Sequence, residues 1–113
     1  MTLLNIEKTD SIDSVAYDAD KKMLAVMLVD GMDWEDEEIH LQLLKDKLNN
    51  YLLYIDTRQF DEKYPDTQRI ELRAAFLYEL PERAMFMVRR AGEVLETLFE
   101  NSILVVDIGP AEE

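Results

Sequence analysis

The densest group of side chains that could bind a metal or transfer a proton lies at residues 33–40, which read DWEDEEIH. This stretch holds five carboxylates and the only histidine of the chain. Glu37 and His40 are three residues apart, which is the Glu-x-x-His spacing that di-iron helical bundles use. Those bundles need a second copy of the motif and further glutamates on other helices. A chain with one histidine cannot repeat the motif, so we expect no metal site here.

The residue patterns of other catalytic sites are also missing from the sequence. A zinc-protease helix needs two histidines around a glutamate, and a calcium loop needs a glycine at its sixth position. The chain has no cysteine, which excludes a thiolate nucleophile, and none of its three glycines stands in a phosphate-binding loop. We therefore expect a protein that is not an enzyme and that binds no cofactor.

A helix start accounts for part of the acidic stretch. Asp33 is a favourable N-cap residue, and the acids that follow it would lie in the first turn, where the helix dipole favours negative charge. Asp36 would lie one turn before His40. We therefore expect a partly exposed histidine that is held by a carboxylate of its own helix.

The spacing of apolar residues predicts the elements that position this stretch. After Asp33 these residues recur with the helical period, which predicts a helix over 34–56. Before it, apolar segments at 14–18 and 23–29 are separated by the polar DADKK, which predicts a β-hairpin. The second segment is apolar at every position, so we expect this strand to lie inside the sheet with both faces at least partly covered.

The second half of the chain continues with strands and helices. Residues 56–68 show no period and contain a proline, which indicates a surface loop anchored by Phe60 and Tyr64. Alternating apolar residues predict a strand at 69–78, and β-branched residues predict another at 102–108, with a helix between them that starts at proline. The order β-β-α-β-α-β predicts an α+β two-layer sandwich, a four-stranded mixed sheet with two helices on one face.

Length, composition and charge limit the class of protein. The chain has 113 residues, and 48% of its side chains are apolar, so we expect a single domain over 1–113. We expect flexible ends at 1–11 and 109–113. The sequence shows no signal peptide and no apolar run of membrane length, which favours a soluble cytoplasmic protein. The net charge is −13, and residues 1–38 carry eleven acids against three lysines. This charge disfavours direct binding to nucleic acid or membranes and favours a basic partner.

The acids of the first third predict a binding surface, provided that the hairpin turn and the helix start share one end of the sandwich. A row of carboxylates there could imitate the phosphates of DNA and bind the lysines and arginines of a nucleic-acid-binding protein or a nuclease toxin. The function expected on this basis is that of a DNA mimic or an inhibitor of immunity-protein type. The expected partner-binding residues are Asp18, Asp20, Asp30, Asp33, Glu35, Asp36 and Glu38.

Two further interpretations remain open. In the first, the acids serve only solubility, and a pocket lined by Trp34, His40 and Tyr64 binds a small ligand or a metal. The second concerns apolar residues on the far side of the first helix, which either a second copy of the chain or the 56–68 loop would cover. These residues are Ile39, Leu43 and Tyr54.

The sequence resembles a family of small bacterial proteins of unknown function. Members share an Asp-Trp pair, an acidic patch, a His-Leu pair and an Asn-x-Tyr on one helix. The corresponding positions are Asp33, Trp34, Glu37, Glu38, His40, Leu41, Asn49, Tyr51, Tyr64 and Pro65. The resemblance implies a bacterial cytoplasmic protein and brings no activity or ligand with it. In charge and size alone, the chain is also similar to bacterial DNA-mimic proteins and to acidic immunity proteins.

Overall fold

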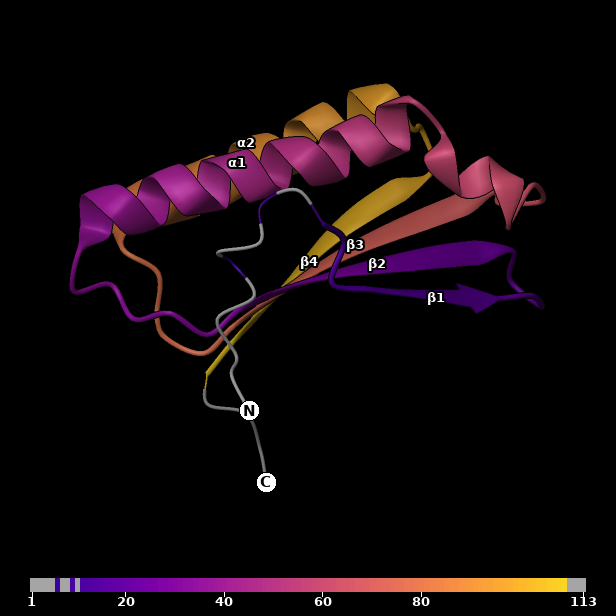
Figure 1. Ribbon diagram of the computed structural model, residues 1–113. Helices are drawn as coiled ribbons and strands as arrows, with labels where there is room; N and C mark the ends of the chain where they lie inside the picture. The colour runs from indigo at the N-terminus through magenta and orange to yellow at the C-terminus, as the bar shows by residue number, and fades with distance from the viewer. Residues whose placement is uncertain (1–5, 7–8, 10, 110–113) are drawn as a thin grey trace.

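A computed structural model describes Ile6, Thr9 and residues 11–109 of the chain. The elements follow the order expected from the sequence (Figure 1). They are β1 (Ser14–Asp18), β2 (Met23–Asp30), α1 (Glu37–Asp56), the short 3-10 helix η2 (Gln59–Glu62), β3 (Arg69–Phe76), α2 (Glu82–Leu98) and β4 (Ser102–Ile108).

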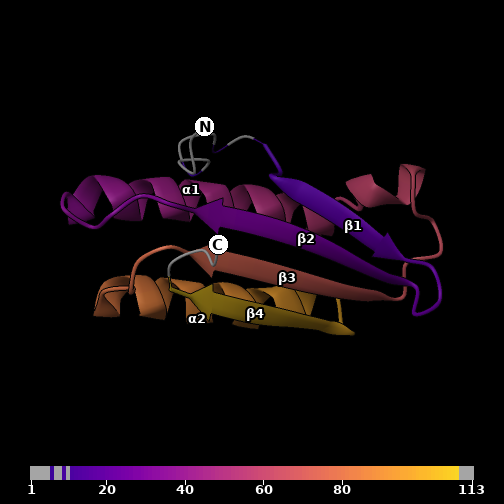
Figure 2. The ribbon, with the colours of Figure 1, turned by 90° about the horizontal axis from the view of Figure 1, so that it is seen from below.

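The four strands form one mixed sheet in the order β1-β2-β3-β4 (Figure 2). β1 pairs with β2 in antiparallel fashion, as expected of a hairpin, whereas β2–β3 and β3–β4 are parallel pairs. Parallel neighbours need crossover connections, and α1 and α2 provide them. Both helices lie side by side on one face of the sheet (Figure 1). The predicted α+β two-layer sandwich is therefore confirmed.

The core lies between the sheet and the two helices. Along β2 and β3 every second side chain is buried, because successive side chains of a strand point to opposite faces. Leu24, Val26 and Leu28 of β2 point towards the helices and are fully buried. At Gly92 of α2, an added Cβ would lie only 3.0 Å from the side chain of Leu104, so glycine lets α2 approach β4 closely.

Helix α1 starts three residues later than the sequence pattern indicated, at Glu37. Asp36, and not Asp33, is its N-cap, since the Asp36 carboxylate accepts a hydrogen bond of 3.2 Å from the amide of Ile39. The carboxylate of Asp33 instead accepts from the amide of Glu35 and stabilises a turn before the helix. Asp33 and Asp36 both precede the apolar residues of the helix. The apolar period alone therefore does not indicate which of the two is the N-cap.

The loop between α1 and β3 is anchored as expected. Phe60 of η2 is buried, and the ring of Tyr64 stacks on Tyr17 of β1 with 4.8 Å between centroids. The flexible ends expected at 1–11 and 109–113 fall largely on residues 1–5, 7–8, 10 and 110–113, which are outside the described residues. No helix within the described residues is long and apolar enough to cross a membrane.

Candidate functional site

The connection from β2 to α1 concentrates negative charge at one end of the molecule. It surrounds a shallow pocket of about 520 Å³ lined by Met32 and five acids. The acids are Asp33, Glu35, Asp36, Glu37 and Glu38. We call these five residues the acidic cluster.

Backbone and side-chain contacts hold the acidic cluster in place. Asp33 and Asp36 accept hydrogen bonds from backbone amides, as described above. Glu38 forms an ion pair of 2.6 Å with Arg83 of α2, and the hydrogen bond from Arg83 lowers the pKa of the Glu38 carboxyl. Glu35 and Asp36 are exposed. The cluster therefore presents a group of carboxylates at the surface.

Asp30 does not belong to this surface, contrary to the expectation from the sequence. Its side chain is 1% exposed at the end of β2. One carboxylate oxygen lies 2.6 Å from Nε2 of His40, and the other accepts a hydrogen bond from the amide of Met32. Burial raises the pKa of the Asp30 carboxyl, while the hydrogen bond to His40 acts in the opposite direction. A buried carboxylate bound to a histidine cannot contact a partner's basic side chain.

His40 is also placed differently from the expectation. It is fully buried, and its Nδ1 donates a hydrogen bond of 2.9 Å to the backbone carbonyl of Asp33. The indole of Trp34 stacks on its ring, with 3.5 Å between ring centroids. Asp36 does not hold His40, because Asp36 caps the helix and His40 points inwards to Asp30. The histidine therefore ties the connection of residues 31–36 to β2 and α1.

The pocket expected from Trp34, His40 and Tyr64 does not form. Trp34 and His40 are stacked on each other, whereas Tyr64 lies near η2, at the opposite end of the sheet (Figure 1). Both ring nitrogens of His40 are occupied by hydrogen bonds within the protein. Within residues 11–109, Ile6 and Thr9, no three His, Asp or Glu side chains are grouped closely enough to hold a metal ion.

Asp18 and Asp20 are also far from the acidic cluster. They belong to the β1–β2 turn, which lies at the opposite end of the sheet from the start of α1 (Figure 1). The eight residues of β2 separate the two ends by roughly 25 Å at about 3.3 Å per residue. The Asp18 carboxylate accepts hydrogen bonds from the amides of Asp20 and Lys21 and so stabilises the turn. The seven expected binding residues therefore do not form one row.

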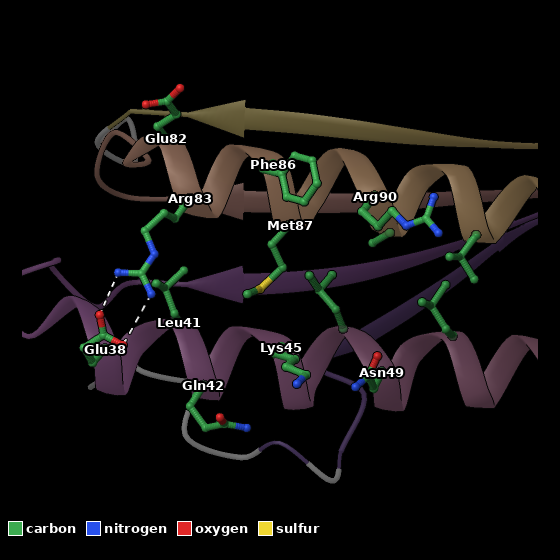
Figure 3. A pocket seen from close by; sticks show the side chains of 14 residues that line it. Glu38, Leu41, Gln42, Lys45, Asn49, Glu82, Arg83, Phe86, Met87 and Arg90 are labelled. Carbon is green, nitrogen blue, oxygen red and sulfur yellow. Dashed lines mark hydrogen bonds and ion pairs between the residues drawn. The ribbon is translucent and has the colours of Figure 1, made fainter.

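A groove of about 770 Å³ runs between α1 and α2 on the outer surface of the helical layer (Figure 3). Its walls include Leu41 and Leu48 from α1 and Met87 from α2. Phe86 stands on the rim with 64% of its surface exposed. The sequence offered a signal for this groove, because Phe86 lies among charged residues, off the apolar stripe of its helix.

The groove and the acidic cluster meet at Glu38, which lines both. The ion pair between Glu38 and Arg83 crosses the groove at the end where both helices begin (Figure 3). Lys45 and Arg90 face the groove about two turns further along. An apolar depression is thus continuous with a carboxylate-rich rim.

The proposed row of Ile39, Leu43 and Tyr54 is not one exposed patch. Ile39 is 55% exposed, but Leu43 and Tyr54 pack against the core. The rings of Tyr54 and Phe60 lie 6.1 Å apart, so η2, within the 56–68 loop, covers Tyr54. The loop therefore covers Tyr54 but not Ile39, and a contact between two copies through these residues stays a prediction.

The fold and the surfaces together define a small two-layer α+β domain with an acidic rim beside an apolar groove. Residues 4–105 match the family of unknown function DUF6572, and the chain belongs to that family. In the comparisons with curated proteins and with solved structures, no protein matched the chain.

Proposed function

We propose that the chain is a non-enzymatic binding module that engages a basic protein partner through the acidic cluster. The observation that carries the proposal is the continuity of the acidic cluster with the apolar groove at Glu38. Carboxylates on an interface rim steer a basic partner and select it, while a central apolar contact supplies most of the affinity. The pairing of the two surfaces at one place favours protein binding over solubility as the role of these acids.

The partner that fits has lysines or arginines beside an apolar anchor. The anchor would enter the groove near Phe86 and Met87, and the basic side chains would contact the carboxylates of Glu35, Asp36 and Glu37. A nucleic-acid-binding protein offers such basic surfaces, so the module would act as a DNA mimic or as an inhibitor. In this version Asp18, Asp20 and Asp30 make no contact with the partner.

The test compares two variants that remove the same amount of charge. Glu35→Gln, Asp36→Asn and Glu37→Gln together remove three of the five carboxylates of the acidic cluster, and Asn at position 36 preserves the helix cap. The matched control neutralises three exposed acids at the other end of the molecule. Its substitutions are Asp20→Asn, Glu62→Gln and Asp66→Asn.

Each protein is immobilised and exposed to bacterial lysate at low salt, and bound proteins are eluted with increasing salt and identified by mass spectrometry. We expect one basic protein to be retained by the wild type and the control but not by the cluster variant. The purified partner should then bind more weakly as salt rises. Equal binding by both variants, or no specific partner, would contradict the proposal.

Two further measurements test the role of the apolar groove and the mimicry of DNA separately. Phe86→Ser should weaken binding by about tenfold or more, whereas Met85→Ser, an exposed residue outside the groove, should not. Double-stranded DNA should compete with the module for the partner if the module mimics DNA. A partner that binds DNA and the module at the same time would exclude mimicry while leaving acidic recognition intact.

A further inference from the structure

The face of the sheet opposite the helices is not covered by any described element (Figures 1 and 2). The strand register assigns the side chains on this face, because paired residues point the same way. On β2 they are Met23, Ala25, Met27 and Val29, which are all apolar. A strand with one solvated face normally alternates between apolar and polar residues, and a strand apolar on both sides is typical of burial on both sides.

The neighbouring strands extend this apolar surface. Ala16 of β1 is paired with Ala25, and Ala75 of β3 is paired with Val29. On β4, Val105 and the 57% exposed Ile103 point to the same side. Methionine side chains are flexible and adapt to a neighbouring surface, so another apolar surface can contact this face closely.

The charges on this face come close to balance, with two arginines against three carboxylates, unlike those of the chain as a whole. At its centre Arg73 forms ion pairs with Glu71 at 2.6 Å and with Asp107 at 2.8 Å. Arg69 adds a second positive charge on the same side of β3. At the edge, the Asp18 carboxylate is engaged in its turn. In a chain of net charge −13, this is a surface on which two copies can approach without bringing many like charges together.

The size of the face sets the strength of such a contact. Strands of five, eight, eight and seven residues, at about 3.3 Å per residue and about 4.8 Å between strands, give roughly 440 Å² per copy. Two copies would bury about 900 Å² in total, slightly less than the roughly 1,000 Å² of a stable specific interface, so the contact would be weak and would depend on concentration. Because this face carries little net charge, it is better suited to contact the same face of a second copy than to bind a basic partner.

We infer that the open face of the sheet is an interface with a second copy of the chain. A two-fold axis near Met27 places the two sheets face to face, with the helices on the outside. This arrangement covers the second side of β2. It leaves the acidic cluster and the groove free in both copies, and it does not involve Ile39, Leu43 or Tyr54.

The first test is the molar mass in solution, measured by light scattering and by sedimentation over a range of concentrations. We expect the molar mass to rise to twice the chain mass of 13.2 kDa as the concentration increases, and we expect the dimer to persist at high salt because the contact carries little net charge. Met27→Lys should shift the protein to the monomer. The control is Met85→Lys, the same substitution at an exposed position of α2, which should remain dimeric.

A second variant avoids the risk that a charge at position 27 disturbs folding. The chain has no cysteine, so Ala25→Cys creates a single thiol on the open face. A short bis-maleimide should link two copies through it, whereas Gln42→Cys on the groove side should stay unlinked. A monomer at all concentrations, or a dimer that Met27→Lys leaves intact and Gln42→Cys links, would overturn the inference. Monomers that capture another protein only through the open face would assign that face to a different partner and overturn it as well.

Discussion

The carboxylate of Asp30 and the imidazole of His40 lie 2.6 Å apart, and both are withdrawn from solvent. Nδ1 of His40 donates to the carbonyl of Asp33, so one proton is shared between Nε2 and the Asp30 carboxylate. The pair connects the end of β2, the acidic connection and the first turns of α1. The pair thereby holds the acidic cluster in position, although neither side chain is exposed at the surface.

Substitution of Asp30 tests this role. Asp30→Ala should lower the free energy of unfolding by about 1–3 kcal/mol, because it leaves Nε2 of His40 and the amide of Met32 without their buried partner. Asp30→Asn should cost less, since the amide group can donate to Nε2 and accept from Met32 at the same time. Urea unfolding at neutral pH measures both. Equal losses would mean that the amide of asparagine does not replace the carboxylate in these hydrogen bonds.

The same carboxyl should make stability depend on pH. Burial raises the pKa of Asp30 above its ordinary value of 3.8, so the folded state holds its proton to a higher pH than the unfolded state does. The stabilisation from this group is therefore complete below 3.8 and is lost as pH rises through the raised pKa. Asn at position 30 does not titrate.

Because the stabilisation by Asp30 is lost as pH rises, a comparison of two proteins can measure it. The free energy of unfolding of the wild type minus that of Asp30→Asn should fall as pH increases from about 4 to about 8. Urea titrations of both proteins across this range give the difference directly. A difference that rises with pH would show that the attraction of His40 and Lys47 outweighs burial at this carboxyl.

The sequence predicted the fold better than the site, for identifiable reasons. The periods of the strands and helices come from apolar residues, and these were buried as expected. The interaction of His40 with Asp30 depends on how a strand end meets a helix, which no local pattern records. Lys47 is also fully buried, although charge predicts exposure.

The positions of His40 and Lys47 in the sequence do indicate that both side chains are buried. His40 and Lys47 lie on the same side of α1 as its buried leucines, at helical spacing from Leu44 and Tyr51. Polar residues on an apolar stripe indicate a buried polar network when partners are available. The expected grouping of Asp18 and Asp20 with the helix start was wrong because strand direction, not composition, sets which turns share an end.

Two tyrosines should respond in opposite ways to loss of the hydroxyl. The Tyr51 hydroxyl accepts a hydrogen bond from the amide of Asp13 and donates one to the carbonyl of Met27. Tyr51→Phe removes both of these buried hydrogen bonds, and it should lower the free energy of unfolding by about 1–3 kcal/mol.

Tyr17 provides the matched comparison. Within the part of the chain that the structure describes, its buried hydroxyl has no hydrogen-bond partner. Tyr17→Phe should be neutral or stabilising, because a buried polar group without a partner costs free energy and the ring can still stack on Tyr64. Denaturant unfolding of both variants decides the point. Equal losses at the two positions would refute the assignment of their hydroxyls.

The ion pair between Lys47 and Asp13 gives the last prediction. The two groups are 2.7 Å apart, with side chains 0% and 5% exposed, and Asp13 also accepts a hydrogen bond from the amide of Val29. Lys47→Met should cost about 3–5 kcal/mol in the free energy of unfolding, because it leaves a buried carboxylate without its cation. Lys45→Met, at an exposed position two residues earlier, should change it by less than about 0.5 kcal/mol.

Adding Asp13→Asn to Lys47→Met separates the pair from the packing of the lysine side chain. The asparagine carries no charge and can still accept from Val29, so the double variant should be more stable than Lys47→Met alone. Recovery of part of the loss would mean that an uncompensated charge, rather than a lost contact, destabilises the single variant. A double variant no more stable than the single one would instead assign the loss to packing, and the buried pair would then contribute little to the stability of the fold.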